Sequence, residues 1–282
     1  VSPGEELKGR SATPAQFHRG SRMLKIRVIP TLLWKQLGLV KGVGFDSWRR
    51  VGPVLPAIKV YNQRDVDELV LLDIVAHLSD DDPDFESVDD FGRDCFVPLT
   101  VGGGITNIGQ VQRLLRSGAD KVSINTAAYA NPALIGDIAQ RHGTQCVVAS
   151  IDVRDEGSGH WTCYSHAGQT NTGRGVHDWA RALEDRGAGE ILITSINRDG
   201  TMEGFDFGLI EAVVEAVDIP VIASGGAGTY DDMVRAVTQC GASAVAAASM
   251  FHYTEQTPAG AKAALERAGA PVRRMYVPPT NS

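Results

Sequence analysis

The sequence has little that would suggest a disulfide-stabilised or metal-stabilised fold. It contains four cysteines among 282 residues, and these are scattered along the chain: Cys95, Cys146, Cys163 and Cys240. Without a close pair, they are typical of reduced thiols rather than of a disulfide or zinc framework. We therefore expect a cytoplasmic protein that uses neither a metal ion nor another cofactor.

Long hydrophobic runs and an excess of positive charge are also missing. No apolar run approaches the about 20 residues of a membrane span. The net charge is −7, which argues against a surface for nucleic acid. The remaining composition, 43% hydrophobic and 22% charged, is that of a globular chain with a large core. The length allows two domains or one large α/β barrel.

The two ends of the chain differ from the rest. Residues 1–22 are polar and aperiodic and lack the apolar centre of a secretory signal, and Met23 resembles a natural start. We interpret 1–22 as a leader that is disordered or left from cloning. The folded domain is predicted to span 23–275, and 276–282 to form a C-terminal tail.

The strongest pattern in the sequence is an internal repeat. The segment Pro98–Ile105, which carries a glycine turn, recurs 122 residues later as Pro220–Ala227. Three further pairs of segments match at offsets between 119 and 123: Gly118–Asn125 with Gly241–Ala248, Glu68–Asp73 with Glu190–Ser195, and Ile29–Leu33 with Val148–Asp152. Four matched pairs at nearly one spacing indicate two halves of one architecture.

Apolar runs typical of buried parallel strands alternate with helical patterns along the chain. We predict strands over 24–33, 69–74, 98–101, 121–125, 146–152, 191–196, 220–223 and 244–248. Residues 34–48 are predicted to form a long loop, and 154–173 a loop with hairpin-like residues. Eight strand–helix units with short connections predict a single (β/α)8 TIM barrel with a two-fold half-barrel repeat, with an open doubly wound sheet as the alternative.

The candidate site residues lie where strands end, because the active sites of such barrels are built at the carboxyl ends of the strands. A glycine turn that leads into a helix leaves backbone N–H groups free to bind an anion. We predict one phosphate site in each half: Gly103, Gly104, Asn125 and Thr126 in the first, and Gly200, Thr201, Gly225, Gly226, Ala248 and Ser249 in the second. A substrate with a phosphate at each end would span the mouth of the barrel.

A carboxylate between the two phosphate sites is a candidate for general acid–base catalysis. Asp152 closes the fifth predicted strand at this position, and Asp199 competes for the same role. The alternative for either residue is a hydrogen-bond acceptor that only fixes a loop.

Four charged residues gather at the opposite pole. Arg27, Glu68, Lys121 and Glu190 fall at or just before the starts of four predicted strands. They are either a salt-bridge ring that stabilises the base of the barrel or a gate into its core. A gate requires a polar constriction with a core of small residues behind it.

The chain resembles the cyclase subunit of imidazole glycerol phosphate synthase over roughly residues 24–273. The resemblance rests on long motifs: Asp67–Val70, Val101–Ile105, Ala119–Ala128, Gly187–Leu192, Asn197–Thr201, Ile222–Gly228 and Ser249–His252. It implies a (β/α)8 barrel that receives ammonia from a glutaminase docked on its amino-terminal face. The ammonia reacts with a doubly phosphorylated ribonucleotide, which is cleaved and cyclised to the imidazole and an aminoimidazole carboxamide ribotide.

The resemblance also implies roles for individual residues. The ammonia gate corresponds to Arg27, Glu68, Lys121 and Glu190, and two positions on the partner-facing side to Asp120 and Gln145. Asp152 matches the second of two catalytic aspartates, and Lys41 matches a lysine of the substrate loop.

The first catalytic aspartate of the family is missing. The family reads Pro-Cys-Leu-Asp on its first strand, whereas this chain reads Pro30-Thr31-Leu32-Leu33, and the leucine cannot exchange a proton. The residue change at Asn197 and the loop over 75–83 are further departures from the family pattern.

Three functions remain open at this point. A divergent branch of the family carries the same leucine and works with a glutaminase in making amidino or amino sugars. We expect an ammonia-using, cyclase-like synthase outside histidine synthesis. A genuine imidazole glycerol phosphate synthase with a relocated acid is the first alternative. A catalytically silent scaffold that activates a glutaminase is the second, although a pure scaffold would not need two intact phosphate turns.

Overall fold

Eight parallel strands close into a barrel in the computed structural model, which describes residues 25–36, 38–64, 66–78, 81–157 and 159–273. The barrel strands are β1 (Arg27–Lys35), β4 (Leu69–Asp73), β5 (Leu99–Gly102), β6 (Lys121–Ile124), β7 (Val147–Asp155), β10 (Glu190–Ser195), β11 (Val221–Ser224) and β12 (Ala244–Ala247). Strand β10 pairs with both β11 and β7, which closes the circle. The predicted (β/α)8 barrel is therefore confirmed, and the open sheet is excluded. The predicted leader and the tail over 276–282 lie outside the described residues.

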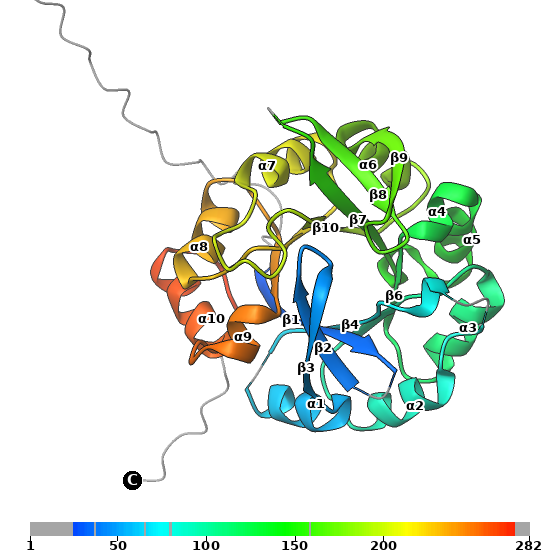
Figure 1. Cartoon of the computed structure of the whole chain (residues 1–282), viewed down its shortest axis with the longest axis horizontal. Helices are drawn as coiled ribbons and strands as arrows, with labels where there is room; N and C mark the ends of the chain where they lie inside the picture. The colour runs from blue at the N-terminus through cyan, green and yellow to red at the C-terminus, as the bar shows by residue number, and fades with distance from the viewer. Residues whose placement is uncertain (1–24, 37, 65, 79–80, 158, 274–282) are drawn as a thin grey trace, which may run out of the picture.

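A ring of helices surrounds the barrel (Figure 1). It consists of α1 (Val54–Gln63), α2 (Phe85–Arg93), α3 (Ile108–Arg116), α4 (Thr126–Ala130), α5 (Ala133–His142), α6 (Val176–Glu184), α7 (Phe207–Ala216), α8 (Tyr230–Thr238), α9 (Ser249–Tyr253) and α10 (Pro258–Arg267). Short 3-10 turns lie at Ala76–Leu78 and Thr144–Cys146. None of the helices in the described parts of the chain has the length and apolar character needed to cross a membrane.

Capping residues fix several helix starts. The Asn107 side chain accepts a hydrogen bond from the Gln110 backbone at 3.1 Å, and the Gln110 side chain binds back to form a capping box. Helix α5 starts after Pro132, where no side-chain cap is found among the described residues, and Asn131 closes the short helix α4.

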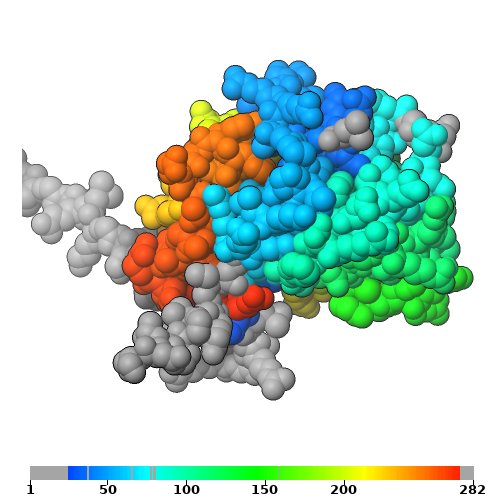
Figure 2. Space-filling view, turned by 90° about the horizontal axis from the view of Figure 1, so that it is seen from below, coloured from blue at the N-terminus to red at the C-terminus, as the bar shows by residue number. Residues whose placement is uncertain are grey.

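Two antiparallel hairpins extend the barrel at its carboxyl end. Strands β2 (Gly38–Val43) and β3 (Asp46–Gly52) follow β1, and β8 (Trp161–Ser165) and β9 (Thr170–Gly175) follow β7. The prediction of a loop over 34–48 was therefore wrong. Strand β3 is largely exposed and has no apolar–polar alternation, so it lacks the sequence signal of a half-buried strand. The hairpin β2–β3 projects at the top of Figure 2.

The hairpins display the half-barrel repeat in three dimensions. Strands β1 and β7 are both 9 residues long, each carries a hairpin, and they lie opposite one another in the strand order. The short helices α4 and α9 also occupy equivalent places, each directly after a strand.

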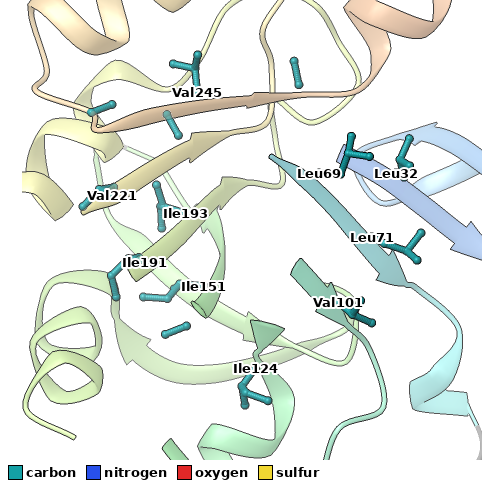
Figure 3. Packing of buried hydrophobic residues seen from close by; sticks show 14 of the residues in the cluster. Leu32, Leu69, Leu71, Val101, Ile124, Ile151, Ile191, Ile193, Val221 and Val245 are labelled. Atoms are coloured by element: carbon teal, nitrogen blue, oxygen red, sulfur yellow. The ribbon is translucent and has the colours of Figure 1, made fainter. Parts of the chain in front are cut away.

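Alternation along the strands divides the apolar core into two layers. Outward-facing residues such as Leu71, Val101 and Ile191 pack between the strands and the helices (Figure 3). Inward-facing residues form a separate cluster that fills the middle of the barrel: Ile29, Val70, Val148, Leu192, Ile222, Ala244 and Ala246. This inner layer separates the amino-terminal and carboxyl-terminal ends of the barrel, where the sequence analysis predicts the charged ring and the phosphate sites.

Candidate active site

A cavity of about 570 Å³ opens at the carboxyl ends of the barrel strands. All but one of the residues predicted to bind phosphate line it: Gly103, Gly104, Asn125, Thr126, Gly200, Gly225, Gly226, Ala248 and Ser249. The exception is Thr201, whose hydroxyl instead donates to the Arg198 carbonyl at 2.9 Å. The fold therefore brings two distant glycine turns to one cavity.

Both glycine turns need glycine for steric reasons. Gly103 has φ +106° and Gly225 has φ +86°, a region that L side chains rarely adopt. A Cβ on Gly103 would collide with the Asp73 carbonyl oxygen, and one on Gly225 would lie 2.6 Å from that of Ser195. The backbone can run this close to the preceding strand end only without a side chain, which leaves the turn open toward the cavity.

The helices beside the two turns start in the same way. Asn125 precedes α4 and Ala248 precedes α9, with backbone φ values of −121° and −120°, and no side chain of the described residues caps either helix start. The Ser249 hydroxyl is buried without a hydrogen-bond partner in the described structure. Uncapped N–H groups and a free hydroxyl are the donors that an anion requires.

Asp152 lies on the cavity wall, buried and held by an amide. Its Oδ2 accepts a hydrogen bond from Asn125 Nδ2 at 2.6 Å. Burial, and next the charge of Asp199, raise the pKa of Asp152 to about 7, although the Asn125 hydrogen bond works against this shift. A carboxyl group with a pKa near 7 can both donate and accept a proton under physiological conditions.

Lys41 and Asp199 form a buried ion pair across the mouth of the cavity. The Lys41 Nζ lies 2.7 and 2.6 Å from the two carboxylate oxygens of Asp199. Burial raises the pKa of Asp199, and the Lys41 ammonium counteracts this rise. The sequence identified both residues but gave no sign of their pairing, since 158 positions separate them.

This ion pair holds the hairpin β2–β3 against the loop that follows β10. The Gly44 N–H also donates to the Asp199 carbonyl at 2.9 Å. The hairpin thereby adds Phe45 and Trp48 to the cavity lining, two aromatic residues that the sequence analysis missed because it interpreted this segment as a loop.

Leu33 lines the same cavity on the wall opposite Asp152. It lies on β1, pairs with Leu72 of β4 and is 8% exposed. The two halves therefore present an apolar side chain and a carboxyl group at equivalent places.

The four charged residues at the amino-terminal pole form one closed ring of ion pairs. Arg27 Nη1 lies 2.7 Å from Glu68 and 3.0 Å from Glu190, and Lys121 Nζ lies 3.1 Å from each of these glutamates. Burial alone would lower the pKa of Arg27, but the carboxylates of Glu190 and Glu68 outweigh it and raise that pKa. A recess of about 220 Å³ lies against the ring, bordered also by Lys25, Pro220 and Ser243.

Only some of the side chains in the inner apolar layer behind this ring are small. Its members from β1, β4, β7, β10 and β11 are isoleucine, valine and leucine, and its two alanines both lie on β12. The expectation of a core of small residues thus holds along one wall of the barrel and not around its whole circumference.

The two residues predicted to face a partner are exposed on this same pole. Asp120, which precedes Lys121 of the ring, accepts a hydrogen bond from the Leu99 backbone at 2.9 Å. Gln145 donates to the His142 carbonyl at 3.2 Å. Their contact with a partner stays a prediction.

Comparisons with known proteins agree with this architecture. The model of the family described as "Histidine biosynthesis protein" matches residues 27–257. The chain is 48% identical over 253 residues to "Imidazole glycerol phosphate synthase subunit HisF" of Hyphomonas neptunium, covering 90% of this chain and 100% of that protein. It is 45% identical over 257 residues to the protein of the same name from Gluconacetobacter diazotrophicus, covering 91% and 99%. The chain therefore belongs to the histidine biosynthesis protein family, among the cyclase subunits of imidazole glycerol phosphate synthase.

Proposed function

We propose that this chain is the catalytic cyclase subunit of an imidazole glycerol phosphate synthase. It uses ammonia from a glutaminase partner to cleave and cyclise a doubly phosphorylated ribonucleotide in histidine synthesis. The observation that carries the proposal is the presence of two polar sites in one barrel. The ion-pair ring lies at the amino end and the cavity with two glycine turns at the carboxyl end, separated by the inner apolar layer.

The ring acts as the gate for ammonia in this proposal. Replacing a buried ion network by apolar residues is often neutral or stabilising, so four retained charges suggest a use beyond stability. Each cation of the ring contacts both anions, so displacement of one side chain opens the ring. The glutaminase docks around it, against Asp120 and Gln145.

The cavity binds the substrate through its two ends. One phosphate occupies the turn at Gly103 and Gly104, and the other occupies the turn at Gly225 and Gly226. The reacting atoms then lie between them, beside Asp152, whose pKa near 7 suits proton transfer at neutral pH. The ion pair of Lys41 and Asp199 holds the hairpin β2–β3 over the bound substrate.

The missing aspartate leaves a second candidate function. The relatives favour the histidine reaction over the expected pathway outside histidine synthesis. Leu33 is the observation that favours amination of another phosphorylated or nucleotide-linked substrate, such as an amidino-sugar or amino-sugar precursor. If the histidine reaction is correct, Asp199 is the residue placed to supply the second acid, since it lies in the cavity and its charge acts on Asp152.

A bacterium that lacks its own cyclase subunit gives the direct test. Expression of this chain together with a glutaminase subunit is expected to restore growth without histidine, and the Asp152→Asn variant is expected not to. In parallel, the purified chain with ammonium salt should release aminoimidazole carboxamide ribotide from the doubly phosphorylated substrate. Failure of both assays with a folded protein would reject the histidine reaction and favour the second candidate.

A further inference from the structure

Thr31 carries a buried hydroxyl group that finds no hydrogen-bond partner among the residues that the structure describes. The residue is 7% exposed, lines the cavity, and its Oγ1 makes no hydrogen bond within the described part of the chain. Burying a hydroxyl without a partner costs free energy, and valine would fill the same volume without that cost. An unpartnered polar atom at the floor of a cavity points to a small polar ligand.

The position of Thr31 on its strand suggests what that ligand is. The inward-facing residues of β1 run from Arg27 in the ring through Ile29 in the apolar layer to Thr31, and then to Leu33 in the cavity. Thr31 is therefore the first hydrogen-bonding side chain on β1 beyond the apolar layer. A molecule that crosses the core along this strand reaches this hydroxyl before it reaches the substrate.

The neighbouring strand β12 contributes small side chains to the inner layer beside β1. On β12, Ala244 pairs with Arg27 and Ala246 pairs with Ile29. Ser243, just before this strand, borders the recess beneath the ring, whereas Ala246 lines the cavity above it. The two alanines of the inner layer thus lie beside the strand that carries Thr31.

The strand is also held in place behind Thr31. The imidazole of His252 hydrogen-bonds to the Thr31 backbone, and burial lowers the pKa of His252 to about 4, so that the ring is neutral. Its Nδ1 lies 3.4 Å from the hydroxyl of Tyr61. These contacts fix the backbone from which the Thr31 hydroxyl faces the cavity.

We propose that the Thr31 hydroxyl is a positioning group that binds neutral ammonia at the floor of the cavity, before it attacks the substrate. This inference rests on the proposed function. A hydroxyl offers one donor and two acceptor sites, which match the lone pair and the N–H groups of ammonia. The half-barrel equivalent is Ser150 on β7, a hydroxyl on the opposite wall. In the second half the carboxyl of Asp152 follows the hydroxyl, whereas in the first half the apolar Leu33 does.

Thr31→Val and Thr31→Ser form a matched pair for the test. Valine keeps the shape and removes the hydroxyl, and serine keeps the hydroxyl. At saturating phosphorylated substrate and constant pH, with ammonium salt as the nitrogen source, Thr31→Val is expected to raise the KM for ammonia about 3- to 10-fold, the loss of one net hydrogen bond. The KM for the phosphorylated substrate should not change, and Thr31→Ser should resemble the wild type.

A structural role for the hydroxyl predicts a different result. If Thr31 only supports packing, both variants keep the wild-type KM for ammonia, and this result overturns the proposal. A rise in the KM for the phosphorylated substrate instead overturns it as well, since the hydroxyl would then bind that substrate. Melting temperatures serve as the control for folding, and Thr31→Val is expected to melt no lower than the wild type.

A crystal structure provides a measurement without turnover. The wild type should show an ordered solvent-sized peak within hydrogen-bond distance of Thr31 Oγ1, and Thr31→Val should lack it. An empty position in the wild type would overturn the inference even if the enzyme is active. A wild type that aminates no phosphorylated substrate would reject the proposed function, and the ammonia assignment with it.

Discussion

The two halves of this barrel share a scaffold but differ in their chemistry. Strands β1 and β7 have the same length, each continues into a hairpin, and they stand on opposite walls. Yet β1 presents Leu33 to the cavity where β7 presents Asp152. The repeat reproduces the backbone and the glycine turns in both halves, whereas a carboxyl group is present at this position in one half only. A repeated backbone can therefore carry different side chains at equivalent places.

The largest expected effect comes from removing the carboxyl group of Asp152, which stands at the place equivalent to Leu33. Asp152→Asn keeps the hydrogen-bonding shape but cannot exchange a proton, so turnover with ammonium salt should fall by about 10²–10⁴-fold. Leu33→Ala, at the equivalent place in the other half, should lower turnover far less. Comparable losses in the two variants would show that the halves contribute through packing and not through proton transfer.

A carboxyl group at position 33 would make the two halves alike, and it tests the same difference by adding a group instead of removing one. Leu33→Asp restores the first catalytic aspartate of the family, and turnover of the histidine-pathway substrate should rise by up to about 10²-fold if the acid is limiting. Steady-state rates at saturating substrate measure this gain. An unchanged rate in a folded variant would mean that another group, such as Asp199, already supplies the acid.

The glycine turns allow a comparison of the two phosphate sites. Gly226 has φ +109°, and a Cβ there would collide with the Gly204 carbonyl, whereas Gly104 has φ +67° and its Cβ would meet the Ala76 methyl at 2.8 Å. A φ of +67° lies near the left-handed region, in which other residues cost about 1–2 kcal/mol. Gly226→Ala should therefore raise the KM for the phosphorylated substrate and lower the melting temperature more than Gly104→Ala does. The reverse order would contradict the steric argument.

Stability is also expected to depend on pH. The pKa of Asp152 is raised to about 7 in the folded protein, so the folded state binds the proton more tightly than the unfolded chain. Its contribution to the free energy of unfolding is fully present below the unfolded pKa of about 4 and is lost as pH rises toward 7. Urea unfolding of wild type and Asp152→Asn at several pH values measures this difference, and parallel curves would contradict the raised pKa.

Much of the fold could be predicted because the signals are local. Alternating strand and helix patterns located the eight barrel strands, and the repeat of the glycine turns indicated two binding sites. The hairpin β2–β3 was missed because its strands contain Gly38 and Gly42, and β3 is mostly exposed. Its stability comes from docking onto a distant loop through Lys41 and Asp199, a tertiary contact that no local pattern contains.

Prediction of the candidate site from sequence is likewise limited to features with a local signal. The sequence placed Asp152 and the glycine turns at the ends of predicted strands, a position that marks them as candidates, although β7 continues past Asp152 to Asp155. Thr31 lies inside a strand, among residues typical of a buried core, and only the three-dimensional structure reveals that its hydroxyl has no hydrogen-bond partner among the described residues. The shifted pKa of Asp152 likewise depends on burial and on Asp199, which the chain brings close only after folding.

The ring of ion pairs offers the most direct test of the claim that ammonia crosses this barrel. With a cognate glutaminase and glutamine, the wild type should form glutamate and cyclised product in equal amounts. Lys121→Ala should produce glutamate in excess of product while its ammonium-driven activity changes less, and Lys25→Ala, at the edge of the same recess, should remain coupled. Equal losses of glutamine-driven and ammonium-driven activity in Lys121→Ala, or no binding of any glutaminase, would contradict the account and leave the ring as a purely structural feature.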